Sequence, residues 1–499
     1  MAHRPLLTVL VSLFAAGLIL CSGRRPNLRD TWTFIAAGLQ FLLALSMLPA
    51  VLAGHTIEAA YITLLPGLAL HLRADPFGLL FALLAAGLWI ITSLYSLGYM
   101  RSGHYGHQTG YFASFAVSLS ATMGIAFAAN LVTFFLFYEL LTLATYPLVV
   151  HNRDPEAMAA GWKYLAYTLG AGQCLLLAIV WMHQLAPEAT FQPGGFLVGK
   201  ASAEALTALV LLGIIGVAVK AAVMPLHSWL PAAMVAPTPV SALLHAVAVV
   251  KAGTFGCIRM VHYVFGIDLL RELGADMVLA SIAGATILLA SIRALGESHL
   301  KRRLAYSTIS QLSYIVLGAV LGSTAALAGA MFHMVAHGCM KITLFFCAGA
   351  IDVKTHKVDI TEFAGLGRQM PITFGAFTLG ALGLAGTPLF VGFISKWNLG
   401  LGALQAGHPV FLAILVLSGL LNFAYFFPII YTAFFGQGAK PPRFNEASPA
   451  LWVPLVLTAL LSLLLGIAPN AGLELYRLAW QAADSLIAGT GHRLAGGTP

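Results

Sequence analysis

Charged residues stand inside long apolar stretches of this sequence. Glu139 lies nine residues after Asn130 in NLVTFFLFYELLTLATYPL, a separation of about 14 Å along a helix. Four lysines occupy comparable positions, namely Lys220, Lys251, Lys341 and Lys396. A charge at the centre of a bilayer costs at least about 2.5–3.5 kcal/mol on insertion scales, so each of these side chains is a functional candidate.

A static ion pair does not explain this set of charges. Glu139 and Lys220 could form a purely structural buried pair, but four lysines with one carboxylate leave positive charge uncompensated. Burial disfavours the charged form of a lysine and a nearby carboxylate favours it, so a change in their separation can load or release a proton. The pattern therefore predicts a relay of coupled proton sites. Lys341 could instead reach the membrane interface, as we expect for Lys163.

Histidines accompany the lysines in the same stretches. His245 precedes Lys251 by six residues. His333 and His337 stand four residues apart on one face of a predicted helix that also carries Lys341. Imidazole can pass a proton between its two nitrogens near physiological pH, so these histidines are predicted to extend the relay. His333 and His337 would also suit two metal ligands or haem contacts, but no third ligand stands nearby in the sequence.

We predict no metal, cofactor or catalytic residue in this chain. The sequence contains no P-loop, no Gly-rich nucleotide loop and no serine elbow. Any redox chemistry is therefore expected in partner chains. The five cysteines have neither metal-site nor disulfide-framework spacing: Cys21, Cys174, Cys257, Cys339 and Cys347.

The composition excludes a soluble fold. Of the 499 residues, 59% are apolar and 9% are charged, against roughly 25% charged residues in an average soluble domain. The formal net charge of +8 could suggest nucleic acid binding, but the basic residues fall in short loops between apolar runs, where they set orientation in a membrane. The sequence therefore predicts a polytopic protein surrounded by a lipid bilayer, with no nucleic acid partner.

Fourteen apolar runs are long enough to cross the bilayer as helices. Lipid offers no partners to backbone amides, and these runs far exceed the alternating strands of a barrel, so the predicted fold class is an all-α polytopic membrane protein. The predicted spans are residues 5–22, 31–53, 77–100, 111–128, 130–150, 162–184, 205–230, 239–261, 274–295, 303–322, 325–350, 371–404, 409–435 and 451–468. The first is expected to stay as an uncleaved span, because small residues do not precede Cys21 as in a cleavage site.

Two of these spans are predicted to be interrupted. The seventh contains Pro225 and Pro231, and proline removes a backbone hydrogen bond and clashes with the preceding turn. The twelfth would measure about 51 Å as one helix, so we expect a break between Gly383 and Pro388. Interrupted helices at corresponding positions of two halves indicate an inverted-repeat transporter.

The interruptions suggest a division of the chain. The seventh and twelfth spans are each fourth in a group of five, and an odd number of spans gives the two groups opposite orientations. We therefore predict inverted five-helix repeats at residues 111–261 and 262–435, with discontinuous helices 7 and 12. Residues 1–110 would form an N-terminal three-helix segment. Residues 436–499 would form a last helix and a short polar tail without a further span.

The basic residues predict the orientation. Short loops rich in Lys and Arg stay in the cytoplasm, and the loops after odd-numbered spans hold most of these residues, so both termini are expected on the outer, periplasmic side. The basic residues of those loops are Arg24, Arg25, Arg29, Arg101, Arg153, Arg293, Lys301, Arg302, Arg303, Lys354, Lys357, Arg368, Lys440 and Arg443.

Long motifs of the chain resemble those of one membrane protein family. The stretch VKAAVMPLHSWLPAAMVAPTPVSALLHAVAVVKAG, residues 219–253, is similar to the signature of the antiporter-like subunits of Mrp-type cation/proton antiporters, respiratory complex I and membrane-bound hydrogenases. Further similar motifs are YELLTLATYPLVV at 138–150, RRLAYSTISQLSYI at 302–315, HMVAHGCMKITLFFCAGAI at 333–351 and GLAGTPLFVGFISKW at 383–397.

The resemblance implies roles for individual residues. Glu139 and Lys220 match the family's glutamate and lysine pair, Lys251 its central relay lysine, and Lys396 its second-half lysine near the exit. His245, His333 and His337 match more variable polar positions on the same axis. The resemblance also implies fourteen helices and outside termini.

The implied function is that of a proton-translocating subunit of a multisubunit monovalent cation/proton antiporter in the bacterial plasma membrane. Its partners would be other membrane subunits, with Na⁺ or K⁺ as the exchanged cation. Lys396 and the length of 499 residues are most similar to the D subunit of Mrp antiporters. One alternative is a pumping subunit of a membrane-bound hydrogenase or of a complex I-like NADH:quinone oxidoreductase, an NADH dehydrogenase (quinone) subunit. Another is a membrane subunit of an inorganic-carbon uptake complex.

Overall fold

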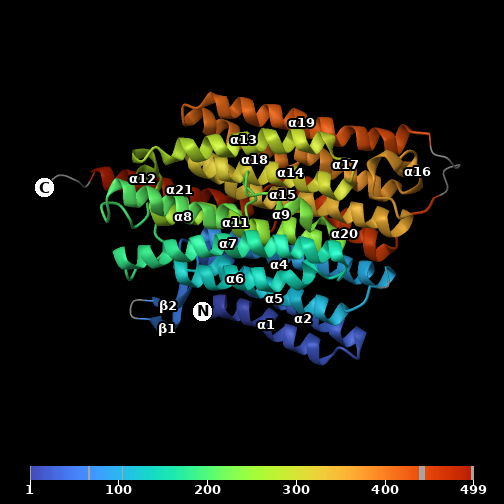
Figure 1. The fold of residues 1–499 in the computed structure, drawn as a ribbon, viewed down its shortest axis with the longest axis horizontal. Coiled ribbons are helices and arrows are strands. Elements are labelled where there is room, and N and C mark those ends of the chain that lie inside the picture. The colour runs from blue at the N-terminus through green and yellow to red at the C-terminus, as the bar shows by residue number, and fades with distance from the viewer. Residues whose placement is uncertain (1, 66–67, 104, 438–443, 496–499) are drawn as a thin grey trace.

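Eleven helices in the described part of the chain are long and apolar enough to cross a membrane. A computed structural model describes residues 2–65, 68–103, 105–437 and 444–495. The long helices run side by side in one bundle (Figure 1). The protein is therefore an all-α, multi-pass membrane protein. Of the basic loop residues named above, Lys440 and Arg443 lie outside the described residues.

The helices are numbered in chain order. They are α1 Arg4–Cys21, α2 Pro26–Leu45, α3 Leu48–Leu52, α4 Pro76–Ser102, α5 Gln108–Phe127, α6 Leu131–Val149, α7 Pro155–Leu185, α8 Ala203–Ala218, α9 Trp229–Ala232, α10 Thr238–Ala242, α11 Val249–Arg259, α12 Ile267–Glu272, α13 Ala275–Gly296, α14 Leu300–Val320, α15 Thr324–Thr355, α16 Leu366–Gln369, α17 Pro371–Ala385, α18 Val391–Gln405, α19 Pro409–Phe435, α20 Pro449–Ile467 and α21 Leu475–Ala495.

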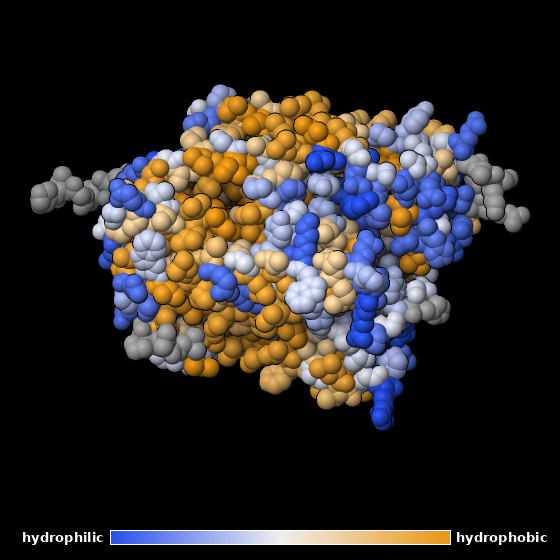
Figure 2. Space-filling view, in the orientation of Figure 1, coloured by the Kyte–Doolittle hydropathy of each residue, from blue (hydrophilic) through white to orange (hydrophobic). Residues whose placement is uncertain are grey.

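The surface has the pattern expected of a membrane-spanning bundle. A broad apolar region covers the middle of the visible face, and hydrophilic residues gather mainly toward the two ends of the helices (Figure 2). The segment 238–265 and helix α15 are instead buried inside the bundle along their most apolar stretches. These two inner segments carry His245, Lys251, His333, His337 and Lys341, so the protein itself surrounds most of the predicted relay residues.

Short polar side chains fix where three of the long helices begin, and two of these helices carry predicted relay residues. Asp75, Asn130 and Ser323 each accept a hydrogen bond from the backbone N–H three residues later, at the starts of α4, α6 and α15. Such caps satisfy amides that have no partner within the helix. The caps therefore set the register of α6, which carries Glu139, and of α15.

In both segments with a predicted interruption the helix stops. Helix α8 ends at Ala218, and only turns separate it from the four-residue helix α9. Helix α17 ends at Ala385, where Gly386 has a φ of +92° that favours glycine, and α18 starts at Val391. The next inner segment is irregular as well, because π-helical turns at Leu243–Val247 and Met260–Phe265 flank α11.

Two elements differ from the sequence-based expectation. Residues between the second and third predicted spans form an antiparallel hairpin of β1 Ile57–Leu65 and β2 Leu68–Ala74. The expected polar tail contains helix α21, which packs against α4 and α15. Its buried residues recur every three or four positions, so one face of α21 is apolar although its composition is mixed. They are Leu475, Leu478, Ala479, Ala482, Ala483 and Leu486.

Close packing of α18 on α15 generates a prediction. A Cβ added at Gly402 would lie 2.3 Å from the backbone nitrogen of Ala326, whereas a Cβ at Gly375 in α17 would meet nothing within 4 Å. Because backbone atoms cannot rotate away, we expect Gly402→Ala to destabilise the protein by about 1–3 kcal/mol, measured by thermal unfolding in detergent. Gly375→Ala is the matched control. Equal unfolding temperatures for the two variants would contradict the packing.

Candidate functional site

The predicted lysines lie inside the bundle. The side chains of Lys220, Lys251 and Lys341 are fully buried, and Lys396 is half-buried. The interfacial position that the sequence left open for Lys341 is therefore not adopted. Lys163, in contrast, is exposed on α7, as expected for a lysine that reaches the surface.

Glu139 and Lys220 are close in the fold but are not bonded to each other. Lys220 follows the end of α8, donates a hydrogen bond to the carbonyl oxygen of Tyr138, and lies 3.3 Å from the centroid of the Tyr138 ring. Both carboxylate oxygens of Glu139 are buried without a hydrogen-bond partner among the described residues. The static ion pair considered from the sequence is therefore absent there, and a neutral carbonyl holds the amine.

The carboxylate of Glu139 occupies space that a glycine leaves open. A Cβ at Gly172 of α7 would lie 2.4 Å from Oε1 of Glu139. Any larger residue at this position would compete with the carboxylate for the same space. Gly172 therefore determines where the acidic group can lie.

The titratable side chains form a buried row that begins at Glu139 and Lys220 and ends at Lys396. Lys251 and two histidines form its centre. The Nζ of Lys251 is 2.8 Å from Nδ1 of His337, and the rings of His337 and His333 are 6.2 Å apart between centroids. All three side chains are fully buried. The structure thus brings together residues from α11 and α15 that are far apart in the sequence.

His333 has two polar partners that are not among the predicted relay residues. Its Nδ1 is 2.8 Å from the hydroxyl of Ser395, and its Nε2 is 3.1 Å from Oε1 of Gln311. Ser395 directly precedes Lys396, so the histidine is linked to the helix of the last lysine. A glutamine inside an apolar span was a usable signal for Gln311, whereas nothing distinguishes Ser395 from other serines in spans.

Lys341 and His245 occupy a second polar region beside this row. Lys341 donates a hydrogen bond of 2.8 Å to the hydroxyl of Ser307, which also accepts one from the hydroxyl of Tyr425. Neither ring nitrogen of the fully buried His245 has a partner among the described residues. His245 packs instead on the Phe345 ring, with 4.7 Å between centroids.

Lys396 ends the row beside a cavity. Its amine donates to the carbonyl oxygen of Leu384 in the last turn of α17. It also lines a cavity of about 600 Å³ between the α17–α18 break and α19. The other walls include Trp397 and Leu420, which are 62% and 65% exposed. The cavity therefore opens between apolar side chains on the outer face of α18 and α19, with Lys396 in its wall.

Buried polar atoms without protein partners mark positions where water is needed. Among the described residues they include Nε2 of Gln311, Nε2 of His337 and both ring nitrogens of His245. Buried polar groups are nearly always hydrogen-bonded to protein or to ordered water. Water at these atoms would connect the lysines and histidines through exchangeable protons, and such an arrangement can carry protons.

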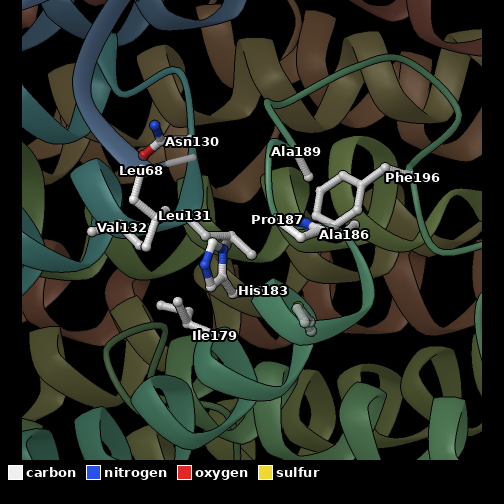
Figure 3. A pocket seen from close by; sticks show the side chains of 11 residues that line it. Leu68, Asn130, Leu131, Val132, Ile179, His183, Ala186, Pro187, Ala189 and Phe196 are labelled. Atoms are coloured by element: carbon white, nitrogen blue, oxygen red, sulfur yellow. The ribbon is translucent and has the colours of Figure 1, made fainter. Parts of the chain in front are cut away.

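A small pocket at the start of α6 lies outside this row. It measures about 20 Å³, which is room for one water molecule, and Asn130 and His183 line it (Figure 3). None of the predicted relay residues contributes to its wall. Within the described ranges, no three His, Cys, Asp or Glu side chains come together as a metal site requires.

The fold and the site define a multi-pass membrane protein with titratable side chains buried in a row across its helices. The sequence profile of the family described as NADH:quinone oxidoreductase/Mrp antiporter, TM, matches residues 128–422, more than half of the chain. The chain belongs to this family, and it is an antiporter-like membrane subunit related to those of Mrp antiporters and complex I.

Individual relatives fall into both branches of the family. The chain is 30% identical to NADH-quinone oxidoreductase subunit N of Desulforudis audaxviator, over 93% of this chain and 96% of that protein. It is 32% identical to the probable A/B subunit of a K(+)/H(+) antiporter of Rhizobium meliloti, over 86% of this chain but only 43% of that longer protein. A chain in the Mrp complex of Dietzia sp. has the same fold, with a TM-score of 0.87, 23% identity and 99% coverage of both chains.

The contact between Lys251 and His337 can be tested by a double-mutant cycle. Each single variant, Lys251→Met or His337→Leu, leaves the other polar group buried without its partner, whereas the double variant removes both. We expect a coupling free energy of about 1.5–3 kcal/mol, measured by thermal or chemical unfolding in detergent. Strictly additive effects would mean that the two side chains do not interact.

Proposed function

We propose that this chain is the proton-translocating subunit of a multisubunit monovalent cation/proton antiporter, similar to the D subunit of Mrp antiporters. The observation that carries the proposal is the buried row in which Lys251 contacts His337 and in which His333 reaches the helix of Lys396. Lysines in such surroundings switch protonation when a neighbour changes its charge. The family membership supports the same function.

The proposed route follows the contacts described above. A proton arrives near Glu139 and Lys220, moves to Lys251, and passes through His337 and His333 toward Lys396. Lys341 and His245 form a branch beside the centre of this route. Each transfer changes the charge next to the following site, so the sites titrate as a coupled set.

The finer architecture belongs to the proposal. In this proposal the eleven candidate spans, α8, α14 and the α17–α18 pair are assigned to the fourteen spans expected from the sequence. Residues 111–261 and 262–435 form the inverted five-helix repeats, with helices 7 and 12 discontinuous. Residues 1–110 form the N-terminal three-helix segment, and residues 436–499 hold the last span and helix α21.

The proposed setting is a bacterial plasma membrane, with both termini on the outer side. The excess of basic residues in the loops after odd-numbered spans supports this orientation. In Figure 1 the start of α1 and the end of α21 lie toward the end of the bundle that carries the β-hairpin. The partners are other membrane subunits of a hetero-oligomeric complex, and Na⁺ or K⁺ is the exchanged cation.

One observation favours a second function, that of a proton-pumping subunit in a complex I-like oxidoreductase. Subunit N of the Desulforudis audaxviator NADH-quinone oxidoreductase is matched over 96% of its length, whereas the Rhizobium meliloti antiporter protein is matched over less than half. Purification of the native complex and identification of its other chains separates the two functions. Small antiporter subunits support the first, and flavin and iron-sulfur subunits support the second.

The lysines at the two ends of the row provide the direct test of proton translocation. We expect Lys220→Ala and Lys396→Ala each to abolish proton transport in vesicles while the complex still assembles, because neither truncated side chain can accept a proton. Lys163→Ala, an exposed lysine on α7, is the control and should transport normally. Transport at the wild-type rate in both end variants would refute the proposed route.

The space beside Glu139 provides a subtler test. We expect Gly172→Ala to displace the carboxylate and lower proton transport roughly tenfold or more, since a displacement of about 1 Å can cost up to a hundredfold. We expect helix packing to persist, because the atom that the new Cβ would meet is at the end of the flexible Glu139 side chain. Gly170→Ala on the same helix meets nothing within 4 Å and is the control. Equal transport by both variants would show that the carboxylate position does not matter.

A further inference from the structure

A buried ion pair lies outside the lysine row and involves a helix of that row. Arg259 is the last residue of α11, and its side chain is 1% exposed. Its two terminal nitrogens lie 2.6 and 2.9 Å from the two carboxylate oxygens of Asp75. Two parallel hydrogen bonds of this kind fix orientation as well as distance. The proposed route uses neither residue.

Four aromatic rings enclose the guanidinium of Arg259. The ring centroids lie between 4.2 and 5.5 Å from its central carbon. The rings are those of Phe77 in α4, Phe255 in α11, Tyr263 in the π-helical turn after α11, and Phe191 in the segment between α7 and α8. Rings at these distances attract a cation and exclude water from it. The position of Arg259 is therefore tightly defined.

Asp75 connects this pair to the starts of two further helices. It directly follows β2, and its Oδ1 accepts a hydrogen bond from Gly78 at the start of α4. Strand β2 is in turn bonded to the start of α6, because Asn130 donates to the carbonyl oxygen of Ala69 and His71 donates to the hydroxyl of Thr133. Asp75 thus ties α11 to the helix that carries Glu139.

Helix α11 needs such an anchor. It has only 11 residues, and π-helical turns replace regular helix on both sides of it. The regular α-helical hydrogen-bond pattern is therefore interrupted on both sides of α11. Arg259 lies eight residues after Lys251, about 12 Å along the helix. A shift at Arg259 would be carried directly to Lys251.

A chain of aromatic contacts links the same arginine to Lys220. Phe191 contacts Phe134 with 6.4 Å between centroids, Phe134 stacks on Tyr138 at 5.1 Å, and Lys220 lies over the Tyr138 ring. Arg259 is thus connected to both of the lysines between which the proposed route requires a transfer.

We propose that Arg259 is a positioning residue, which through its ion pair with Asp75 fixes α11 and holds Lys251 beside His337. This inference rests on the proposed function, because it assigns Arg259 the role of aligning the relay. Arg259 itself exchanges no proton in this scheme.

The test uses variants of the assembled complex. Arg259→Gln and Asp75→Asn both remove the ion pair, but asparagine still accepts the hydrogen bond that starts α4, so helix capping is preserved. We expect proton transport per assembled complex to fall between about tenfold and a hundredfold in each. The double variant should transport protons no more slowly than either single variant, because both remove the same ion pair. Arg259→Lys should recover part of the lost transport. Arg271→Gln, which removes an exposed ion pair with Asp268, is the control.

A structure of the Arg259→Gln complex supplies a readout that does not depend on transport. We expect the Nζ of Lys251 to move beyond hydrogen-bonding distance of His337. An unchanged contact of 2.8 Å, or a variant that loses only yield and thermal stability, would overturn the inference. Normal transport by Lys251→Ala would instead refute the proposed function, and the measured contact would still decide the role of Arg259.

Discussion

The structure depends on lysine amines buried in a low-dielectric interior without salt-bridge contacts. In the described part of the chain, no salt bridge involves Lys220, Lys251, Lys341 or Lys396. Their hydrogen-bond partners are carbonyl oxygens, an imidazole and a hydroxyl. A fixed carboxylate contact would stabilise the charged lysine and oppose loss of its proton, whereas neutral partners bond to the amine and leave its charge free to change. Under the proposed function, this absence of fixed counter-ions makes the row conductive rather than structural.

The break between α17 and α18 provides a neutral partner of this kind for Lys396. A carbonyl oxygen inside a regular helix is already bonded to the amide four residues later, so a lysine that bonds to it must share the oxygen through its second lone pair. The oxygen of Leu384 lies in the last turn of α17, where no later amide of the helix can bond to it. The break after Ala385 thus provides the acceptor for Lys396, and Gly386 allows the turn because its φ of +92° suits no larger side chain. Lys220 also follows the end of a helix, α8, but its acceptor is the carbonyl oxygen of Tyr138 inside α6. The interruption therefore supplies the acceptor for Lys396, whereas Lys220 uses an oxygen of an intact helix.

The sequence predicted the residues of the site better than their contacts. Charge inside apolar runs singles out Glu139 and the four lysines as candidates, because insertion cost is a property of each residue alone, and the structure places all five inside the bundle. Proline and glycine identified both interruptions for the same reason. The pairing of Lys251 with His337, the partners of His333, and the Arg259–Asp75 pair all join residues far apart in the chain, and no local pattern encodes them. The sequence does not predict the hairpin at residues 57–74, because its strands lie between apolar spans long enough to be helices and their pairing depends on contacts between the two strands. The mean hydropathy of the C-terminal segment does not predict helix α21, because the polar residues on its other face lower the average.

The two ends of the row differ physically from its centre. At the centre, Lys251 contacts His337 and His333 contacts Gln311, and Lys251 and His333 are fully buried. At one end the carboxylate of Glu139 has no hydrogen-bond partner among the described residues, and at the other Lys396 lines a cavity with exposed walls. Under the proposed function, Glu139 and Lys396 are the ends at which the row exchanges protons with its surroundings, and the centre passes them on. The same difference explains why the centre requires precise helix placement, since proton transfer between fixed groups depends on distances that small shifts of α11 or α15 would change.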